Sequence, residues 1–214
     1  MSEVTRERLA YVRTPDDELD RIVDLIKPAG PGPLRVVDPC CGEGLALTSL
    51  QTALEKRHGM SVATFGTEAD QSLAEEAKER LHQCLWARYQ DARWAEASMD
   101  VMLLSPPSGG GELELQFLRE TQDLLRHGGL LFYIIRRRNL NGYIAARLAG
   151  HFDVLCVYAW EAEHVEDHDQ IVVVARKRQQ ATDEAAKEQL RAIGRQAKDA
   201  EQSRMPVGLP GRGL

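Results

Sequence analysis

The chain contains no apolar run close to the ~20 residues that a membrane-spanning helix needs. Its first residues, MSEVTRERLAYVR, carry charges where a secretory signal would need an apolar segment. Only 4 of the 214 residues are cysteines, and two of these are adjacent, which argues against a disulfide-stabilised scaffold. We therefore expect a soluble cytoplasmic protein with reduced thiols and no membrane partner.

The chain also lacks an excess of basic residues. Its net charge is −6, from 27 Lys and Arg against 33 Asp and Glu. This balance excludes a protein that coats nucleic acid through bulk charge, although it leaves room for a local basic surface.

Metal-binding motifs are also missing. Cys40 and Cys41 have neither a second CxxC pair nor a nearby histidine, so we interpret them as small packing residues of a turn. His164 and His168 lie in a polar segment between two predicted strands, and a solvated loop is the better interpretation. We expect no metal site.

The composition changes near Arg178. Residues 179–214 contain few large apolar residues and no aromatic residue, and their charges recur near i,i+4 spacing. We predict a solvated helix over roughly 181–203, followed by a disordered end rich in proline and glycine. The folded domain is expected to span residues 1–178, with residues 179–214 as a charged tail.

Residues 1–178 alternate between strand-like and helix-like segments. We expect Thr14 to start a helix with Pro15 at its first position, and its apolar face to bury Leu19, Ile22, Val23 and Ile26. Later helices are predicted to end at residue 58, to run from 70 to 85 and from 113 to 125, and to include 144–148. Strands are predicted at 34–38, 60–67, 90–93, 100–105, 130–135, 154–160 and 171–176.

This alternation predicts an α/β fold, a doubly wound and mostly parallel sheet with helices on both faces. No helix separates the last two strands, so they should form an antiparallel hairpin at or near one edge. Such a sheet binds its ligands beyond the carboxyl ends of its strands.

Unusual motifs fall at these strand ends. The turn Asp38-Pro39-Cys40-Cys41-Gly42-Glu43-Gly44 combines glycines, which allow close approach of a ligand, with acids that suit a ligand carrying ammonium and sulfonium charges. Glu68 follows at the end of the second strand, where an acid can accept hydrogen bonds from both ribose hydroxyls. Asp91 closes the third predicted strand, where its carboxylate could accept an adenine amino hydrogen.

The segments VVDPCCGEG, FGTEAD and HGGLLFYII, with a strand that ends in a proline pair, resemble a class I S-adenosylmethionine-dependent methyltransferase. The Ser105-Pro106-Pro107 element resembles the amino-methylating nucleic-acid enzymes, the adenine-N6 and cytosine-N4 group. The stretch Tyr11-Val12-Arg13-Thr14-Pro15 resembles the threonine–proline start of many such enzymes. More narrowly, residues 11–178 are similar to an uncharacterised family of methyltransferase-like domains from bacteria and their mobile elements.

The resemblance implies S-adenosylmethionine as the cofactor and assigns residues to it. The methionine part would lie on the turn that contains Asp38, Pro39, Cys40, Gly42 and Gly44. Glu68 would hold the ribose and Asp91 the adenine, while Thr14 and Pro15 would lie near the carboxylate end.

The resemblance also implies a catalytic loop, Ser105-Pro106-Pro107-Ser108. The Ser105 hydroxyl and the Pro106 carbonyl would accept hydrogen bonds from the acceptor amine, and catalysis would rest on positioning and electrostatics. At position 108 the family pattern has an aromatic residue that stacks on the flipped base, a contact worth about 1–3 kcal/mol, whereas this chain has serine. Tyr11, Tyr143 and Trp160 are candidates to replace that aromatic.

Three functions are consistent with these motifs. The first is a methyltransferase that acts on an amino group of DNA or RNA, and the second is a cofactor-binding module that has lost catalysis and binds nucleic acid or a partner protein. The third is an enzyme with a protein amide or a small molecule as its acceptor. Arg136, Arg137 and Arg138 could contact phosphates or form an exposed strand end. Because no long insertion could read a DNA sequence, specificity could come from a partner protein.

Overall fold

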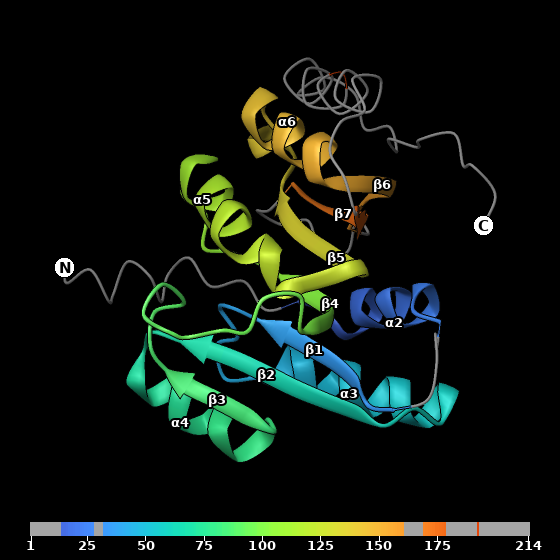
Figure 1. The fold of residues 1–214 in the computed structure, drawn as a ribbon, viewed down its shortest axis with the longest axis vertical. Coiled ribbons are helices and arrows are strands. Elements are labelled where there is room, and N and C mark those ends of the chain that lie inside the picture. The colour runs from blue at the N-terminus through green and yellow to red at the C-terminus, as the bar shows by residue number, and fades with distance from the viewer. Residues whose placement is uncertain (1–13, 28–31, 161–168, 179–191, 193–214) are drawn as a thin grey trace.

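We analysed a computed structural model that describes residues 14–27, 32–160, 169–178 and 192. The described residues form a seven-stranded sheet in the order β3-β2-β1-β4-β5-β7-β6 (Figure 1). The strands are β1 (Leu34–Asp38), β2 (Val62–Glu68), β3 (Gln83–Trp86), β4 (Met99–Leu104), β5 (Leu125–Arg136), β6 (Phe152–Ala159) and β7 (Gln170–Lys177). The helices are α2 (Asp16–Leu25), α3 (Leu45–His58), α4 (Gln71–Arg80), α5 (Glu112–Thr121) and α6 (Gly142–His151).

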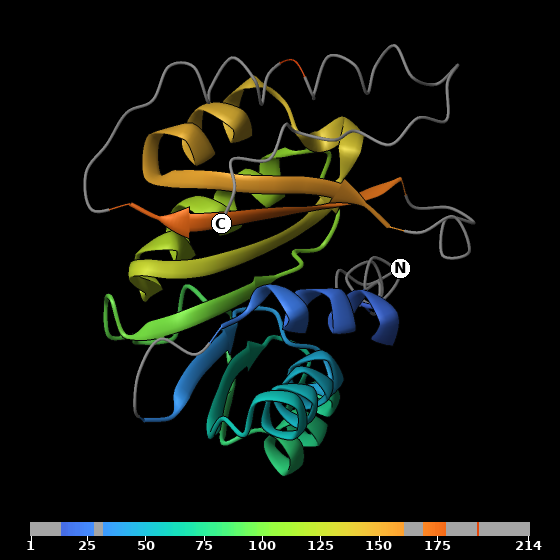
Figure 2. The same ribbon diagram turned by 90° about the vertical axis from the view of Figure 1, so that its right-hand side faces the viewer.

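The predicted fold class is confirmed. Strands β1 to β5 pair in parallel, and β7 pairs antiparallel with both β5 and β6. The core of one face includes residues of α2, α3 and α4, and the core of the other includes residues of α5 and α6 (Figures 1 and 2). The chain order reverses between β1 and β4, so the ligand crevice of such a sheet is expected at the carboxyl ends of these two strands.

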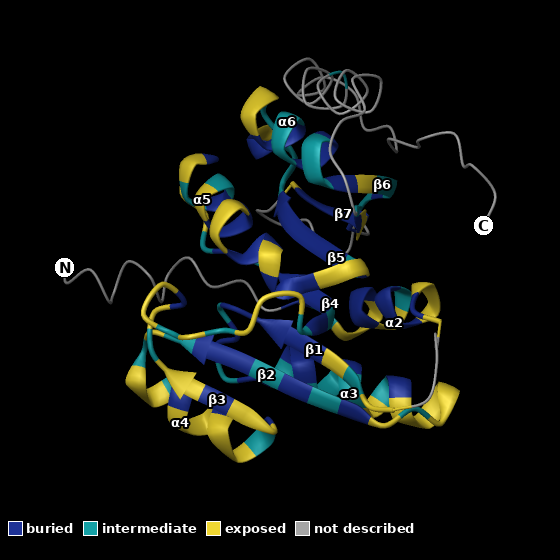
Figure 3. Ribbon diagram, in the orientation of Figure 1, coloured by how far each residue is buried: buried dark blue, intermediate teal, exposed yellow. Residues whose placement is uncertain are grey.

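Burial explains why the strands form where they do. Strand β4 and residues 129–136 of β5 are almost wholly buried, as Figure 3 shows in dark blue, because helices cover both faces. The four predicted core residues, Leu19, Ile22 and Val23 of α2 and Ile26 just after it, are each at most 2% exposed. The strand at 34–38 has the predicted bounds, and α3 ends at the predicted His58, followed by Gly59 in the left-handed conformation.

The third strand was predicted at the wrong place. Residues 83–86 form β3, paired in parallel with β2, whereas residues 90–93 lie in a turn and a loop. Leu81 and Leu85 continue the apolar period of α4, but the helix ends at Arg80 because the backbone of Leu81 is extended. Pairing with β2 therefore overrides the local helical pattern.

Two helix boundaries also differ from the prediction. Helix α2 begins at Asp16, one residue later than predicted, because the backbone of Pro15 is extended, with a ψ of 152°, and Pro15 is the N-cap. Helix α5 ends at Thr121, and a short 3-10 helix, η1 (Gln122–Leu124), leads directly into β5. The backbone N–H groups of Ala97 and Ser98 donate to the carbonyls of Asp123 and Leu124, which fixes this early turn.

Several predictions fall on residues outside the described ranges: Tyr11, the loop with His164 and His168, and the tail apart from residue 192. Within the part of the chain that the structure describes, no helix has both the length and the apolar character needed to cross a membrane.

Candidate functional site

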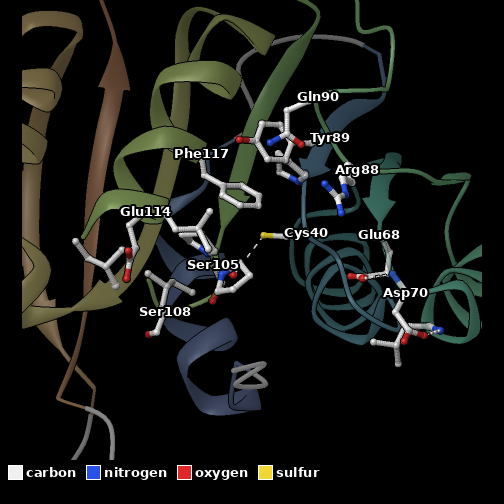
Figure 4. A pocket seen from close by; sticks show the side chains of 18 of the residues that line it. Cys40, Glu68, Asp70, Arg88, Tyr89, Gln90, Ser105, Ser108, Glu114 and Phe117 are labelled. Carbon is white, nitrogen blue, oxygen red and sulfur yellow. Dashed lines mark hydrogen bonds between the residues drawn. The ribbon is translucent and has the colours of Figure 1, made fainter. Parts of the chain in front are cut away.

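A pocket with a volume of about 240 Å³ lies at the carboxyl ends of the central strands, where the chain order reverses. Figure 4 shows Glu68 and Asp70 at one end of this pocket, Ser108 and Glu114 at the other, and Cys40 between them. Its walls therefore bring three of the predicted cofactor residues, Pro39, Cys40 and Glu68, and the predicted catalytic loop to one cavity. The lining residues used below are Pro39, Cys40, Glu68, Arg88, Tyr89, Gln90, Ser105, Pro106, Pro107, Ser108, Leu113, Glu114, Phe117, Arg136 and Gln170.

The glycine-bearing turn after β1 is held by its own backbone and by the end of β2. Asp38 is 4% exposed, and its Oδ1 accepts a hydrogen bond from the Cys40 N–H at 2.9 Å. The Thr67 hydroxyl donates to the Pro39 carbonyl at 2.8 Å. The turn is therefore a rigid part of the pocket wall.

Glu68 joins this turn to the start of α4. Its Oε2 accepts from the Gly42 N–H at 2.9 Å, and its Oε1 accepts from the Asp70 N–H at 2.8 Å. The Asp70 side chain in turn caps α4 by accepting from the Leu73 N–H, as predicted. Each carboxylate oxygen of Glu68 can accept a further bond, so this arrangement fixes the carboxylate without using up its capacity to bind a ligand.

Gly44 shows why glycine is needed in the turn. Its φ is +81°, and a Cβ there would lie 3.2 Å from Leu81 Cγ and 3.3 Å from Ala77 Cα. Any side chain would therefore push α4 away from the turn.

Buried acidic groups set the electrostatics of this end of the site. Burial raises the pKa of Asp38 from 3.8 to about 7, against the lowering effect of the Cys40 hydrogen bonds. Burial also raises the pKa of Glu68 and, together with the charge of Asp38, that of the Cys40 thiol. A cation in the pocket would offset these costs, so the environment favours a positively charged ligand.

The catalytic loop predicted at Ser105-Pro106-Pro107-Ser108 follows β4 and lines the same pocket. The Cys40 thiol donates to the Ser105 carbonyl at 3.3 Å, which connects the turn after β1 to this loop. Pro106 is buried and Ser108 is exposed. The two motifs, 65 residues apart in the sequence, are thus direct neighbours.

Glu114 holds the glycine-rich continuation of this loop. Its carboxylate is 1% exposed and accepts from the Gly109 and Gly111 N–H groups at 3.1 and 2.8 Å, and from Asn139 Nδ2 at 2.6 Å. Tyr133 on β5 donates its hydroxyl hydrogen to the Glu114 carbonyl at 2.7 Å. Glu114 was not among the predicted site residues, although an acid three residues after Gly111 at a helix start is a recognisable capping pattern.

An aromatic pair also lines the pocket and was not predicted. The rings of Tyr89 and Phe117 have centroids 4.2 Å apart at an interplanar angle of 39°. Phe117 lies one helical turn after Leu113, which also lines the pocket. Of the candidates proposed to replace the missing aromatic, Tyr143 is 77% exposed and Trp160 is buried outside the pocket lining.

Some predicted cofactor residues do not line the pocket. Asp38, Gly42 and Gly44 lie behind its wall, where they shape the turn. Thr14 and Pro15 lie at the start of α2, outside the lining.

Asp91 is exposed, and its N–H donates to the Arg88 carbonyl. In this structure Gln90 and Arg88, rather than Asp91, line the pocket. The prediction that Asp91 closes the third strand is wrong because that strand already ends at Trp86.

The three arginines after β5 have different environments. Arg136 lines the pocket, whereas the Arg137 Nε lies 3.2 Å from Asp169 Oδ1 and forms an ion pair. Arg138 is exposed. Within the described ranges, no group of three or more His, Cys, Asp or Glu side chains could hold a metal ion.

The sequence profile of an uncharacterised methyltransferase family (DUF6094) matches residues 2–204 of the chain. The chain belongs to this family. No curated protein sequence matches the chain. The predicted relationship to class I methyltransferases and to an uncharacterised methyltransferase-like family is thereby confirmed.

Solved structures of proteins described as methyltransferases show the same fold. A Listeria monocytogenes protein described as a class I S-adenosylmethionine-dependent methyltransferase superposes with a TM-score of 0.67 at 16% identity, over 77% of this chain and 60% of that chain. A geranyl diphosphate methyltransferase in complex with S-adenosylmethionine gives a TM-score of 0.54 at 14% identity, over 76% of this chain and 85% of that chain. The M. jannaschii tRNA m1G37 methyltransferase gives 0.56 at 11% identity, over 80% and 52% of the two chains.

The DUF6094 chain therefore spans about three fifths of the Listeria protein and about half of the tRNA methyltransferase. The family and the fold agree with the predicted cofactor, S-adenosylmethionine. The residues present fit this group: the buried acids suit its two positive charges, and the Glu68 carboxylate borders the pocket where a ribose could reach it.

Proposed function

We propose that this protein transfers a methyl group from S-adenosylmethionine to an amino nitrogen of a nucleic-acid base. The observation that carries the proposal is the single pocket lined by the turn after β1 and by the Ser105-Pro106-Pro107-Ser108 loop, joined through the bond from Cys40 to Ser105. A cofactor on that turn and an acceptor amine on that loop would be adjacent, as methyl transfer requires.

The loop offers acceptors suited to an amine. A conjugated amine is a poor nucleophile because its lone pair is delocalised into the ring. Hydrogen bonds from its two N–H groups to the Ser105 hydroxyl and the Pro106 carbonyl would favour a pyramidal nitrogen with an available lone pair. When bound, the cofactor supplies the electrophilic methyl group; the chain supplies position and a polar environment.

Further observations support a nucleic-acid base as the acceptor. The Tyr89–Phe117 pair gives the pocket an aromatic wall, Arg136 lines the pocket, and Arg138 is exposed two residues further along the chain. One solved neighbour is described as a tRNA methyltransferase. We further propose that a partner protein supplies sequence specificity. All four cysteines lie outside disulfides, which supports a cytoplasmic location.

Calorimetric titration with S-adenosylmethionine and with S-adenosylhomocysteine tests the cofactor site. We expect micromolar binding of both, and at least a tenfold loss of affinity for Glu68→Gln, whose side chain lines the pocket. Glu43→Gln is the matched control, because Glu43 belongs to the same turn but does not line the pocket. Absence of binding to the wild-type protein would refute the proposed function.

Transfer of a tritiated methyl group tests the acceptor. The protein is incubated with labelled S-adenosylmethionine and, separately, with total RNA, total DNA and total protein, and the products are digested to nucleosides or amino acids. We expect label on an amino-methylated nucleoside. Label confined to protein would leave the methyltransferase activity standing but overturn the nucleic-acid acceptor.

A second candidate is a cofactor-binding module without catalysis. The exposed Ser108 favours it, because the residue that would stack on a flipped base is missing. Cofactor binding without transfer to any of the three acceptors would support this candidate. Transfer that rises in Ser108→Tyr would instead show that stacking was the missing contribution.

A further inference from the structure

Gln170 is a buried polar residue at the acceptor end of the pocket with an unsatisfied oxygen. It begins β7, pairs with Arg136 across the sheet, lines the pocket and is 7% exposed. Its Oε1 is buried and has no hydrogen-bond partner among the described residues. The side chain has no role in the contacts that hold the turn or the Ser105-Pro106-Pro107-Ser108 loop.

Such an oxygen calls for an explanation. Most buried side-chain oxygens in folded proteins accept a hydrogen bond from another protein group, because burial removes the water molecules that would otherwise donate one. An unpaired oxygen therefore costs free energy, which a ligand that donates a hydrogen bond would recover. Because Gln170 lines the pocket, rotation of its side-chain amide would turn this oxygen toward a bound molecule that donates a hydrogen bond.

The register of the sheet shows that Gln170 and Ser105 can contact one molecule. Leu104 lies opposite Tyr133, and Arg136 lies opposite Gln170, so Gln170 is two strands from β4 and about two residues beyond the level of Ser105. With standard strand spacings, their Cα atoms are on the order of 12 Å apart. The lengths of the two side chains close most of this gap, so both could accept hydrogen bonds from neighbouring N–H groups on one edge of a nucleobase.

We propose that Gln170 recognises the acceptor by accepting a hydrogen bond from a ring N–H that lies beside the reacting amine. This inference rests on the proposed function, in which Ser105 and Pro106 already take both hydrogens of the amine. A further donor must therefore come from the ring. Guanine carries an N–H next to its exocyclic amine, whereas adenine and cytosine carry a lone pair there, so the acceptor class is a guanine base.

Nuclear magnetic resonance of the glutamine side chains tests this contact directly. The protein is labelled with ¹⁵N-glutamine and saturated with S-adenosylhomocysteine, and the Gln170 amide signals are assigned from their loss in Gln170→Glu. Titration with GMP is expected to shift these signals at lower concentration than titration with AMP or CMP. A response to AMP or CMP equal to that to GMP, or no response to any of them, would overturn the inference.

Variants add a quantitative check on the same complex. We expect Gln170→Leu to weaken GMP binding at least tenfold, and Gln170→Glu, which keeps an oxygen in place, to retain it within about threefold. Gln116→Leu is the matched control, because Gln116 is exposed on α5 outside the pocket lining, and it should leave GMP binding unchanged. Equal GMP affinity of Gln170→Leu and wild type would contradict the proposal.

The two proposals fail separately. If the wild-type protein does not bind S-adenosylhomocysteine, the proposed function is refuted. Normal binding of S-adenosylhomocysteine with an unresponsive Gln170 refutes only the recognition of guanine. If Gln170→Leu fails to fold, the wild-type titration and Gln170→Glu still decide the question.

Discussion

Asp38 shows at the scale of one residue how burial behind the pocket wall makes stability depend on pH. Its carboxyl group is 4% exposed and accepts a hydrogen bond from the Cys40 N–H, and burial raises its pKa from 3.8 to about 7. Between these two pH values the folded chain holds a proton that the unfolded chain has released. Stability contributed by Asp38 is therefore fully present below about pH 4 and is lost as the pH rises to about 7.

The first prediction concerns Asp38→Asn, which keeps an oxygen for the Cys40 N–H but cannot ionise. As the pH rises from 4 to 7, the unfolding free energy of the variant should increase relative to that of the wild type by up to about 4 kcal/mol. Above pH 7 the difference should stay constant. Urea unfolding at a series of pH values measures the difference. Asp91→Asn, which removes an exposed carboxylate in the loop after β3, is the control and should follow the wild-type profile. A constant offset between Asp38→Asn and wild type would contradict the argument.

A second prediction separates the two costs of replacing a glycine, which are backbone strain and steric contact. Gly44 and Gly59 both have positive φ, but a Cβ meets Leu81 and Ala77 at Gly44 and nothing within 4 Å at Gly59. Gly59→Ala should lose about 1–2 kcal/mol of unfolding free energy from backbone strain alone. Gly44→Ala should lose roughly 1–3 kcal/mol more, because α4 must move. Thermal and urea unfolding of both variants measure this, and equal losses would show that the contact with α4 does not matter.

At the scale of elements, long-range pairing explains where the sequence predictions failed. The strand at 34–38 and the hairpin of β6 and β7 were predictable, because uniform apolar runs and the absence of an intervening helix leave few alternatives. Strand β3 was not predictable, because Leu81 and Leu85 fit the helical period of α4. Only the pairing of β3 with β2 shows that this segment is a strand. Residue patterns within one segment carry no signal about such a partner.

The third prediction concerns the junction between the Gly109–Gly111 loop and α5. The buried Glu114 carboxylate accepts three hydrogen bonds. In Glu114→Gln, the new amide N–H would face one of these three donors and leave it without an acceptor. Glu114→Gln should lose about 2–3 kcal/mol of unfolding free energy. Glu112→Gln, an exposed change in the first turn of the same helix, should lose less than about 1 kcal/mol. Urea unfolding compares the two, and equal losses would indicate that the loop does not depend on Glu114.

At the scale of the whole molecule, the sequence located the site better than it described its walls. Strand-end motifs predicted that Cys40, Glu68 and the Ser105–Ser108 loop would meet, because the carboxyl ends of parallel strands share one edge of the sheet. Tyr89 and Gln170 were missed as site residues. Tyr89 follows β3, whose position depends on its pairing with β2, and Gln170 begins β7, which reaches the site only because it pairs with β5. Asp91 was misplaced for the same reason, since β3 ends before the predicted strand begins.

The distribution of charge over the whole molecule leads to the last prediction. The net charge of −6 disfavours binding of nucleic acid through a broad basic surface, and Arg137 is paired with Asp169. Of the three consecutive arginines, Arg136 lines the pocket and Arg138 is exposed. Binding to single-stranded RNA should therefore involve about one or two phosphates, which gives a slope of roughly −0.7 to −1.4 for log K against log salt.

Fluorescence anisotropy with a labelled single-stranded RNA, measured across a range of salt concentrations, tests this slope. Arg138→Gln should weaken binding and reduce the magnitude of the slope by about 0.7. Arg126→Gln removes the same charge at the opposite end of β5, where Arg126 pairs with Asp100, and should change neither quantity. Because both variants alter the net charge equally, any difference between them reports position rather than total charge. Equal effects of the two substitutions, or a wild-type slope several times steeper, would place the RNA on another surface.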